Sequence, residues 1–247
     1  MAWYKDWFNS KYYHLLYKNR DHNEAALFLD NISNEFKNKN AKILDVACGK
    51  GRHAKYLNNL GFDVTGIDLS VNSIKYAKEY ENQKLKFHQH DMRNIFDENN
   101  FDIVTNLFTS FGYFDDTLDN QKAINSMSDN LKEEGLLLID FMNIKKIILT
   151  LVANEIKVIE NIKFKISRKI IDNHIIKKIN IEDEESIFEH QEKVHCLTLF
   201  DFTEMLEKAN MKIINLFGDY DLNNFDELKS DRLITVSYTH LTLPTKA

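Results

Sequence analysis

A glycine-rich segment between a short apolar run and a helical pattern constrains this chain more than any other feature. The apolar run at residues 43–47 is typical of a buried strand, and it ends just before the G-x-G-x-x-A segment at 49–54. Glycines at that place let the backbone turn with positive φ, and the N-terminus of the following helix offers N–H donors to a ligand. The segment therefore predicts a strand, a cofactor-binding loop and a helix in succession.

The same alternation continues along the first part of the chain. Apolar runs typical of strands are separated by helical patterns, and Ser70 is the expected N-cap of one of these helices. The expected strands are 62–67, 85–90, 101–107 and 136–139. Because strands that alternate with helices pack economically as a parallel sheet covered on both faces, we predict an α/β fold with a doubly wound, mostly parallel sheet.

The pattern changes at about residue 155, where apolar and polar residues begin to alternate with period two. Such alternation is typical of half-buried strands. Asp172-Asn173 and Glu184-Glu185 are the expected turns between these strands. The segment therefore predicts an antiparallel β insertion in the α/β fold.

The chain divides into five expected regions. Apolar and aromatic residues at helical spacing predict one or two helices within 11–36, and a helix at 201–210 with strands near 212–218 and 232–236 is expected to return to the main sheet. The last residues, VSYTHLTLPTKA, hold the only proline, which favours a non-native extension over a frayed edge strand. The regions are a helical cover (1–40), a cofactor-binding core (41–150), an antiparallel substrate lid (151–200), a return to the core (201–235) and a tail (236–247).

Two aspartates lie at the expected strand ends, and one of them discriminates between adenosine cofactors, since the glycine loop alone suits NAD and its alternatives equally. Asp45 precedes the loop at the strand end, where its carboxylate would repel a pyrophosphate. It would attract the ammonium and sulfonium groups of S-adenosylmethionine (SAM). Asp68, at the end of the next strand, can accept hydrogen bonds from ribose hydroxyls of either cofactor, or can cap the next helix. The charge of Asp45 therefore favours SAM.

The segment ILDVACGKGRHAKYLNNLGFDVTGIDLS resembles the first two motifs of class I SAM-dependent methyltransferases, especially small bacterial members with a G-x-G-R-H-A loop. The resemblance extends through His90-Asp91-Met92-Arg93 and the segment 106–113, and covers about residues 3–235. It implies an enzyme with a seven-stranded Rossmann-like methyltransferase sheet and SAM as its cofactor. Intact motif residues argue against the alternative of a binding scaffold that has lost catalysis.

The resemblance also implies roles for individual residues. Asp91 would accept from the adenine amino group, Met92 would cover the adenine ring, and backbone near Leu107 would meet the methionine ammonium. N-terminal aromatic and basic residues, here Tyr13, Tyr17 and Arg20, would close over the cofactor, whereas Cys48 is interpreted as a packing residue. The expected cofactor-binding residues are Asp45, Ala47, Gly49, Gly51, His53, Asp68, Leu69, Asp91, Met92, Leu107, Tyr17 and Arg20.

A catalytic base is not identified by the sequence. Methyl transfer is an in-line displacement whose main demand is alignment, and a base is needed only for acceptors that must lose a proton. His14 and Tyr113 are the candidates that we carry forward, and His53 and His90 are further histidines in the expected site region. Each of these histidines has an alternative role as an ordinary surface or core residue.

Composition favours one class of methyl acceptor and one cellular compartment. The net charge of −6, from 32 basic and 38 acidic residues, argues against a protein built wholly to grip nucleic acid. A small-molecule acceptor is therefore favoured, with RNA or protein as the alternative. Without a 20-residue apolar window, a signal peptide, or cysteines spaced for disulfides or zinc, the expectation is a cytoplasmic protein with no membrane segment and no metal. Oligomeric state is left open.

Overall fold

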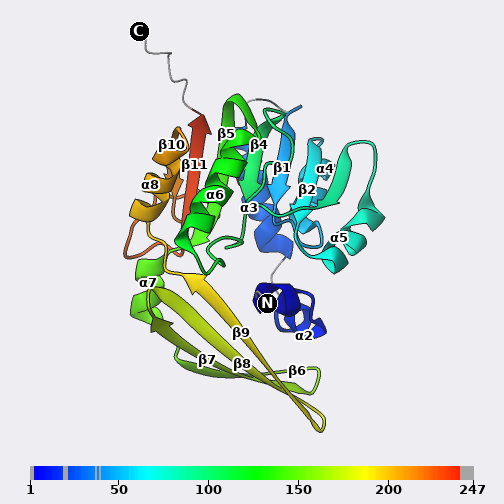
Figure 1. The fold of residues 1–247 in the computed structure, drawn as a ribbon, viewed down its shortest axis with the longest axis vertical. Helices are drawn as coiled ribbons and strands as arrows, with labels where there is room; N and C mark the ends of the chain where they lie inside the picture. The colour runs from blue at the N-terminus through cyan, green and yellow to red at the C-terminus, as the bar shows by residue number, and fades with distance from the viewer. Residues whose placement is uncertain (1–2, 19–21, 37, 39, 240–247) are drawn as a thin grey trace.

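The computed structural model describes residues 3–18, 22–36, 38 and 40–239 of the chain. It consists of an α/β core, a second sheet below the core in the view of Figure 1, and two short N-terminal helices beside that sheet. The predicted α/β class with an antiparallel insertion is confirmed.

The main sheet has seven strands in the order β10-β11-β5-β4-β1-β2-β3. Its neighbouring strands are parallel except where β11 pairs, since β11 runs antiparallel to both β5 and β10. The strands are β1 (Lys42–Val46), β2 (Asp63–Asp68), β3 (Leu85–Gln89), β4 (Phe101–Asn106), β5 (Leu131–Met142), β10 (Met211–Phe217) and β11 (Arg232–Thr239). The chain winds outward from β1 in one direction and from β4 in the other, so the carboxyl ends of β1 and β4 form the switch point where ligands of such sheets bind.

Helices cover both faces of this sheet, which explains why the central strands are apolar on both sides. Phe28 and Ile32 of α3 pack in one buried cluster, and Ile124 of α6 packs with Phe202 of α8 in another. The helices are α3 (His22–Glu35), α4 (Arg52–Asn59), α5 (Val71–Ala77), the 3-10 helix η1 (Lys78–Tyr80), α6 (Thr117–Asp129), α7 (Ile144–Thr150) and α8 (Leu199–Lys208). Ser70 caps α5 as predicted, because its side chain accepts from the Ser73 amide.

The insertion forms a four-stranded antiparallel sheet in the order β6-β7-β8-β9. Asp172 and Asn173 both have positive φ at the turn between β7 and β8, and Glu184 has positive φ at the next turn. These are the two turns that the sequence predicts, and paired left-handed residues suit the twist of a tight hairpin. The strands are β6 (Asn154–Ile159), β7 (Ile162–Ile171), β8 (His174–Asp183) and β9 (Ser186–His195).

Helices α1 (Trp3–Phe8) and α2 (Lys11–Leu16) lie between the core and the second sheet in Figure 1. Trp7, Tyr12 and Leu16 share a buried cluster with the inward-facing residues Phe164 and Ile179 of the second sheet. Within 11–36 the structure has two helices, α2 and α3, as the sequence pattern predicts. Helix α1 precedes that range and was not predicted, although its aromatic residues at 3, 4, 7 and 8 have helical spacing.

The last strand runs past residue 236, where the tail was expected to begin. β11 continues to Thr239, and Val236, Ser237 and Tyr238 pair with residues of β5. Composition could not show this, because hydrogen bonding to a neighbouring strand depends on register rather than on local residue type. Residues 240–247 lie outside the described part of the chain. Within the described residues, no helix has the length and apolar character that a membrane span requires.

Candidate functional site

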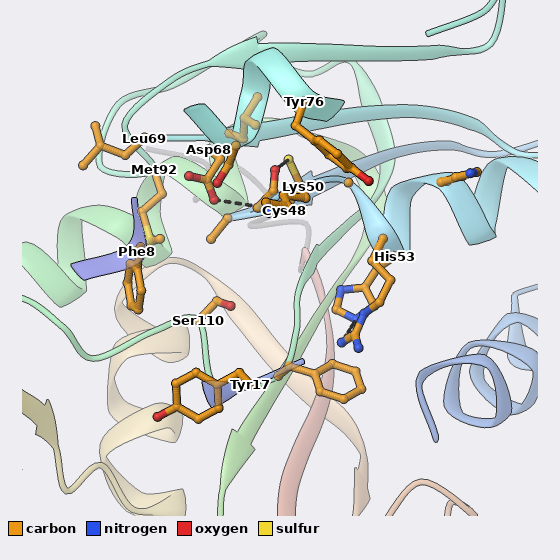
Figure 2. Close-up of a pocket in the computed structure, with 18 of the residues that line it drawn as sticks. Phe8, Tyr17, Cys48, Lys50, His53, Asp68, Leu69, Tyr76, Met92 and Ser110 are labelled. Carbon is orange, nitrogen blue, oxygen red and sulfur yellow. Dashed lines mark hydrogen bonds between the residues drawn. The ribbon is translucent and has the colours of Figure 1, made fainter. Parts of the chain in front are cut away.

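A cavity of about 860 Å³ opens at the carboxyl ends of β1, β2 and β4. Figure 2 shows Asp68 beside the glycine loop, Leu69 and Met92 along one side, and Ser110 and Tyr17 across from them. Of the predicted site residues, those on the cavity wall are Tyr13, His14, Tyr17, Ala47, Gly49, Gly51, His53, Asp68, Leu69, His90, Asp91, Met92 and Tyr113. Asp45 and Leu107 are not on the wall, and Arg20 lies outside the described residues.

The glycine loop between β1 and α4 turns through left-handed backbone. Gly49 has φ of 55° and Gly51 has φ of 78°, and the non-glycine residue Ala47 also has φ of 60°. The Gly51 amide donates to the Cys48 carbonyl at 2.9 Å, which closes the turn. A Cβ atom on Gly51 would lie 2.6 Å from the Phe87 ring, so this glycine also permits close packing of the loop against β3.

We expect Gly51→Ala to destabilise the fold by about 2 kcal/mol, because the new methyl group overlaps a buried ring in a left-handed backbone. Gly49→Ala is the matched control, since a Cβ atom there meets nothing within 4 Å. Urea denaturation of the two variants measures the difference. Equal losses of stability in both would show that packing against Phe87 is not the reason for glycine at position 51.

Asp68, at the end of β2, joins the glycine loop to the start of α5. Its carboxylate oxygens accept from the Gly49 amide at 2.9 Å and from the Ser70 amide at 2.7 Å. Burial raises the pKa of Asp68. Each oxygen keeps a second lone pair, and the side chain is on the cavity wall, so the same carboxylate can shape the loop and accept hydrogen bonds from a ligand.

Asp91 and Met92 follow β3 and form the next part of the wall. The Asp91 carboxylate accepts from the Arg93 amide at 3.0 Å and from the Arg93 guanidinium at 2.6 Å. Arg93 also contacts Asp119 at 2.6 Å. The guanidinium lowers the pKa of Asp91, which keeps this carboxylate ionised and oriented.

Asp45 lies beneath the loop, and its side chain is not on the cavity wall. The residue is 1% exposed, and its Oδ1 atom accepts from the Thr105 hydroxyl at 3.2 Å. Burial raises the pKa of Asp45 to about 7. The physical reason is that Asp45 is inside β1, a central strand flanked by β2 and β4, and not in the exposed turn that follows.

The buried carboxyl group of Asp45 makes stability depend on pH. Because its folded pKa lies above the ordinary value of 3.8, its stabilising contribution is complete below about pH 4 and is lost as pH rises through about 7. We expect Asp45→Asn to gain stability relative to the wild type over that interval, since the amide stays neutral. Urea titrations of both proteins in the absence of ligand, from about pH 4 to about pH 8, measure this difference. Parallel stability profiles would contradict the assignment.

The loop after β4 is held in shape by residues that the sequence analysis did not single out. Phe108 and Thr109 have φ of 56° and 60°, which is uncommon for residues with side chains. Their amides donate to the Asp140 side chain at 2.8 Å and to the Asp140 carbonyl at 3.0 Å. Arg232 in turn donates to Asp140 at 2.8 Å and to the Thr109 hydroxyl at 2.9 Å. The only signal in the sequence was a single charged residue within the apolar run LLLIDF.

This loop also places the aromatic and hydroxyl groups of the wall. Leu107 is 2% exposed and packs in the core, whereas Phe108, next to it, lines the cavity. The Phe108 ring stacks on His53 at 4.6 Å with an interplanar angle of 17°. His53 Nε2 lies 2.8 Å from a guanidinium nitrogen of Arg52. The stack and this contact together orient His53 at the cavity edge.

The two candidate bases both lie on the cavity wall but differ in their ability to accept a proton. Burial lowers the pKa of His14, with Lys50 adding to the effect, so the imidazole is neutral near pH 7 and able to accept a proton. The Tyr113 hydroxyl donates to the Thr109 carbonyl. A tyrosine with this hydroxyl proton already engaged is the poorer base, so the geometry favours His14 of the two.

Within the described residues, no group of three His, Cys, Asp or Glu side chains is placed to hold a metal ion. Burial raises the pKa of the Cys48 thiol well above its ordinary value, so this cysteine stays protonated behind the loop.

Comparison with known proteins agrees with this geometry. Residues 43–135 match the family model described as a methyltransferase domain. The putative methyltransferase YqeM of Bacillus subtilis is 40% identical over 103 residues, which are 40% of this chain and 41% of that protein. The dTDP-3-amino-3,4,6-trideoxy-alpha-D-glucopyranose N,N-dimethyltransferase of Streptomyces venezuelae is 29% identical over 100 residues, 40% of this chain and 42% of that protein. The chain thus spans about two fifths of the length of the curated relatives it matches.

A solved structure extends the similarity of fold to most of the chain. An S-adenosylmethionine-dependent methyltransferase from Clostridium acetobutylicum superposes with a TM-score of 0.78 at 20% identity, covering 93% of this chain and 96% of that one. The seven-stranded sheet with its antiparallel addition is therefore the fold of that S-adenosylmethionine-dependent methyltransferase, and residues 43–135 within it match the methyltransferase-domain model.

Proposed function

We propose that this protein transfers a methyl group from SAM to a small-molecule acceptor. The observation that carries the proposal is the cavity of about 860 Å³ at the switch point of the sheet, with α1 and α2 over it. Small-molecule sites commonly have volumes of about 300–1,000 Å³. The cavity therefore has room for a nucleoside cofactor together with a small acceptor, but not for a folded polymer.

One part of the cavity wall suits the cofactor, and we assign another part to the acceptor. Asp68, Asp91 and Met92 form the end that suits adenosine, with carboxylates for ribose hydroxyls and the adenine amino group. The glycine loop and the residues around Ser110 lie where the methionine part would extend. Phe8, Tyr13 and Tyr113 form an aromatic part of the wall, with Phe8 beside Met92 in Figure 2, and we assign this part to the acceptor.

The proposed chemistry requires alignment more than acid or base strength. When bound, SAM supplies an electrophilic methyl group and a sulfur atom that receives the electron pair of the broken carbon–sulfur bond. An acceptor lone pair must point at that methyl carbon, and the aromatic wall would hold the acceptor in this direction. The names of two relatives describe N,N-dimethyltransferases of amino sugars, which supports a nitrogen nucleophile. Neutral His14, which lines the cavity, would take the proton of an ammonium acceptor.

Ion pairing on the second sheet disfavours RNA as the acceptor. Lys163 and Lys165 both lie beside Glu182, and Arg168 lies 2.7 Å from Glu155. Cations that are already paired with carboxylates release fewer counterions when a polyanion binds. The basic residues of the insertion therefore fit a solvated sheet better than a phosphate-binding face.

We expect SAM and S-adenosylhomocysteine to raise the melting temperature, whereas NAD leaves it unchanged, because a ligand stabilises the native state that it binds. Thermal unfolding with each ligand measures the effect. Stabilisation by NAD without stabilisation by SAM would contradict the proposal.

Labelled SAM identifies the acceptor class. Incubation of the protein with SAM carrying a labelled methyl group and a cell extract, fractionated into metabolites, RNA and protein, shows which pool receives the label. Label in the metabolite pool supports the proposal. Label in RNA or protein would move the acceptor to a polymer, and binding of SAM without labelling of any pool would support the non-catalytic scaffold.

A further inference from the structure

The second sheet reaches the cavity indirectly. Among the described residues, none of β6 to β9 is on the cavity wall, although the region was expected to act as a lid over the acceptor. Helices α1 and α2 lie between this sheet and the core (Figure 1), and Phe8 of α1 and Tyr17, directly after α2, are on the wall. These helices are one route from the insertion to the cavity. A second is the His195 amide of β9, which donates to the carbonyl of the wall residue Gly112 at 2.8 Å.

Glu192 of β9 is the polar link between the insertion and both helices. Its Oε1 atom accepts from the Trp7 indole of α1 at 2.7 Å and from the hydroxyl of Tyr17, directly after α2, at 2.6 Å. Its Oε2 atom lies 3.3 Å from the Lys177 ammonium. One carboxylate oxygen thus holds both helices at the same time.

The surroundings make this link stronger than a surface ion pair. The Glu192 and Lys177 side chains are only 16% and 13% exposed, so solvent screens them weakly. Trp7 is 1% exposed, and its ring also packs on His190 of β9 at 4.6 Å. The Lys177 ammonium donates to the Tyr17 hydroxyl and lies 4.6 Å from the centre of the Tyr17 ring. Tyr17 is therefore held by two residues, Glu192 and Lys177, that are not on the cavity wall.

We propose that Glu192, with Lys177 as its counter-ion, is a positioning residue of the cofactor cavity. It holds α1 and α2 against the second sheet and so keeps Tyr17 on the cavity wall. This role rests on the proposed function, since it assigns to the insertion a contribution to cofactor affinity. The insertion then supports helices α1 and α2 at the site and does not contact the acceptor.

The chain offers a matched control for a merely structural ion pair. Glu182 of the same sheet pairs with Lys163 and Lys165, and its side chain is 34% exposed. Val158 and Ile187 are the register partners of Lys163 and Glu182, and both are exposed, which places this pair on the face turned away from α1 and α2. Removal of Glu182 changes the charge of the sheet without touching the link to the helices.

The experiment compares the double variant Lys177→Met/Glu192→Leu with Glu192→Gln and with the control Glu182→Leu. The double variant removes both charges at once, which avoids leaving an unpaired buried ion and keeps the protein folded. Affinity for S-adenosylhomocysteine is measured by calorimetry. The packing of α1 is followed by acrylamide quenching of tryptophan fluorescence, since both tryptophans of the chain, Trp3 and Trp7, are in α1.

We expect the double variant to lose at least about tenfold in affinity, equivalent to about 1.4 kcal/mol. Its tryptophan fluorescence should be quenched more strongly than that of the wild type. Glu192→Gln should recover most of the affinity, because its amide oxygen can still accept from Trp7 and Tyr17. Adding Tyr17→Phe to the double variant should cause little further loss, as expected for residues that act through one contact. Glu182→Leu should match the wild type in both measurements.

Unchanged affinity in a folded double variant, with S-adenosylhomocysteine still binding to the wild type, would overturn the role of Glu192 and leave the proposed function intact. An equal loss in Glu182→Leu would overturn it as well, because the effect would then belong to the sheet as a whole. If the wild type binds no S-adenosylhomocysteine, the proposed function fails first, and the positioning role fails with it.

Discussion

Asp140→Ala is expected to lower the free energy of unfolding by about 3–5 kcal/mol, the usual effect of removing one partner of a buried ion pair. Asp140 is 0% exposed, and its loss leaves the Arg232 guanidinium partly buried beside an apolar strand. The amide of Phe108 also loses its acceptor, in a loop whose backbone is already left-handed. Urea denaturation at neutral pH measures the effect.

Asp231→Ala is the control for the Asp140 experiment, because Asp231 forms an exposed pair with Lys146 at 2.6 Å near the same end of β11. Exposed ion pairs contribute about 0–1 kcal/mol to stability, so the free energy of unfolding of Asp231→Ala should remain close to that of the wild type. The double variant Asp140→Leu/Arg232→Leu should recover stability, because it removes both charges, but not the cofactor affinity, because the loop at Phe108 loses its anchor. Similar stability of Asp140→Ala and Asp231→Ala would show that the network does not hold the loop.

Asp68→Ala is expected to weaken SAM binding by about 1.5–3 kcal/mol, the usual contribution of a hydrogen bond to a charged group. The variant removes the proposed acceptor for the ribose hydroxyls and leaves the Gly49 amide without its carboxylate partner. Calorimetric titration with SAM measures the loss. The SAM affinity of Asp68→Asn should lie between the affinities of Asp68→Ala and the wild type, since its amide oxygen can still accept one of these hydrogen bonds.

The control for Asp68 is Asp63→Ala at the opposite end of the same strand, which lies outside the cavity wall. We expect Asp63→Ala to bind SAM like the wild type. A folded Asp68→Ala protein with unchanged SAM affinity would show that Asp68 shapes the loop only, as the helix-capping alternative predicts. Circular dichroism of each variant establishes that the fold is retained before affinities are compared.

Local pattern was sufficient to predict the sheet and one edge of the site. The strand before Gly49 and the strand that ends at Asp68 are short apolar runs, and alternation with helices makes them parallel neighbours. Parallel neighbours end at the same edge of a sheet, so Asp68 could be predicted to lie near the glycine loop from chain order, whereas Asp91 and Met92 were expected there from the resemblance to methyltransferases. The period-two pattern after residue 155 likewise predicted the second sheet, because alternation is a property of each strand by itself.

Such patterns do not predict strand register or long-range packing. Periodicity could not show that Asp45 points beneath the loop, because the direction of one side chain depends on how its strand is buried between two others. It also could not extend the last strand to Thr239, since composition does not report the hydrogen bonds to β5.

The sequence by itself determined the class of fold, the position of the cofactor loop and the chemistry of the residues beside it, because each of these follows from short segments and from chain order. Only the tertiary structure decided what holds the site in shape. Asp140 and Arg232 are 92 residues apart, and Tyr17 and Glu192 are 175 apart. Contacts over such separations arise from the packing of whole elements against one another, and no local pattern records them.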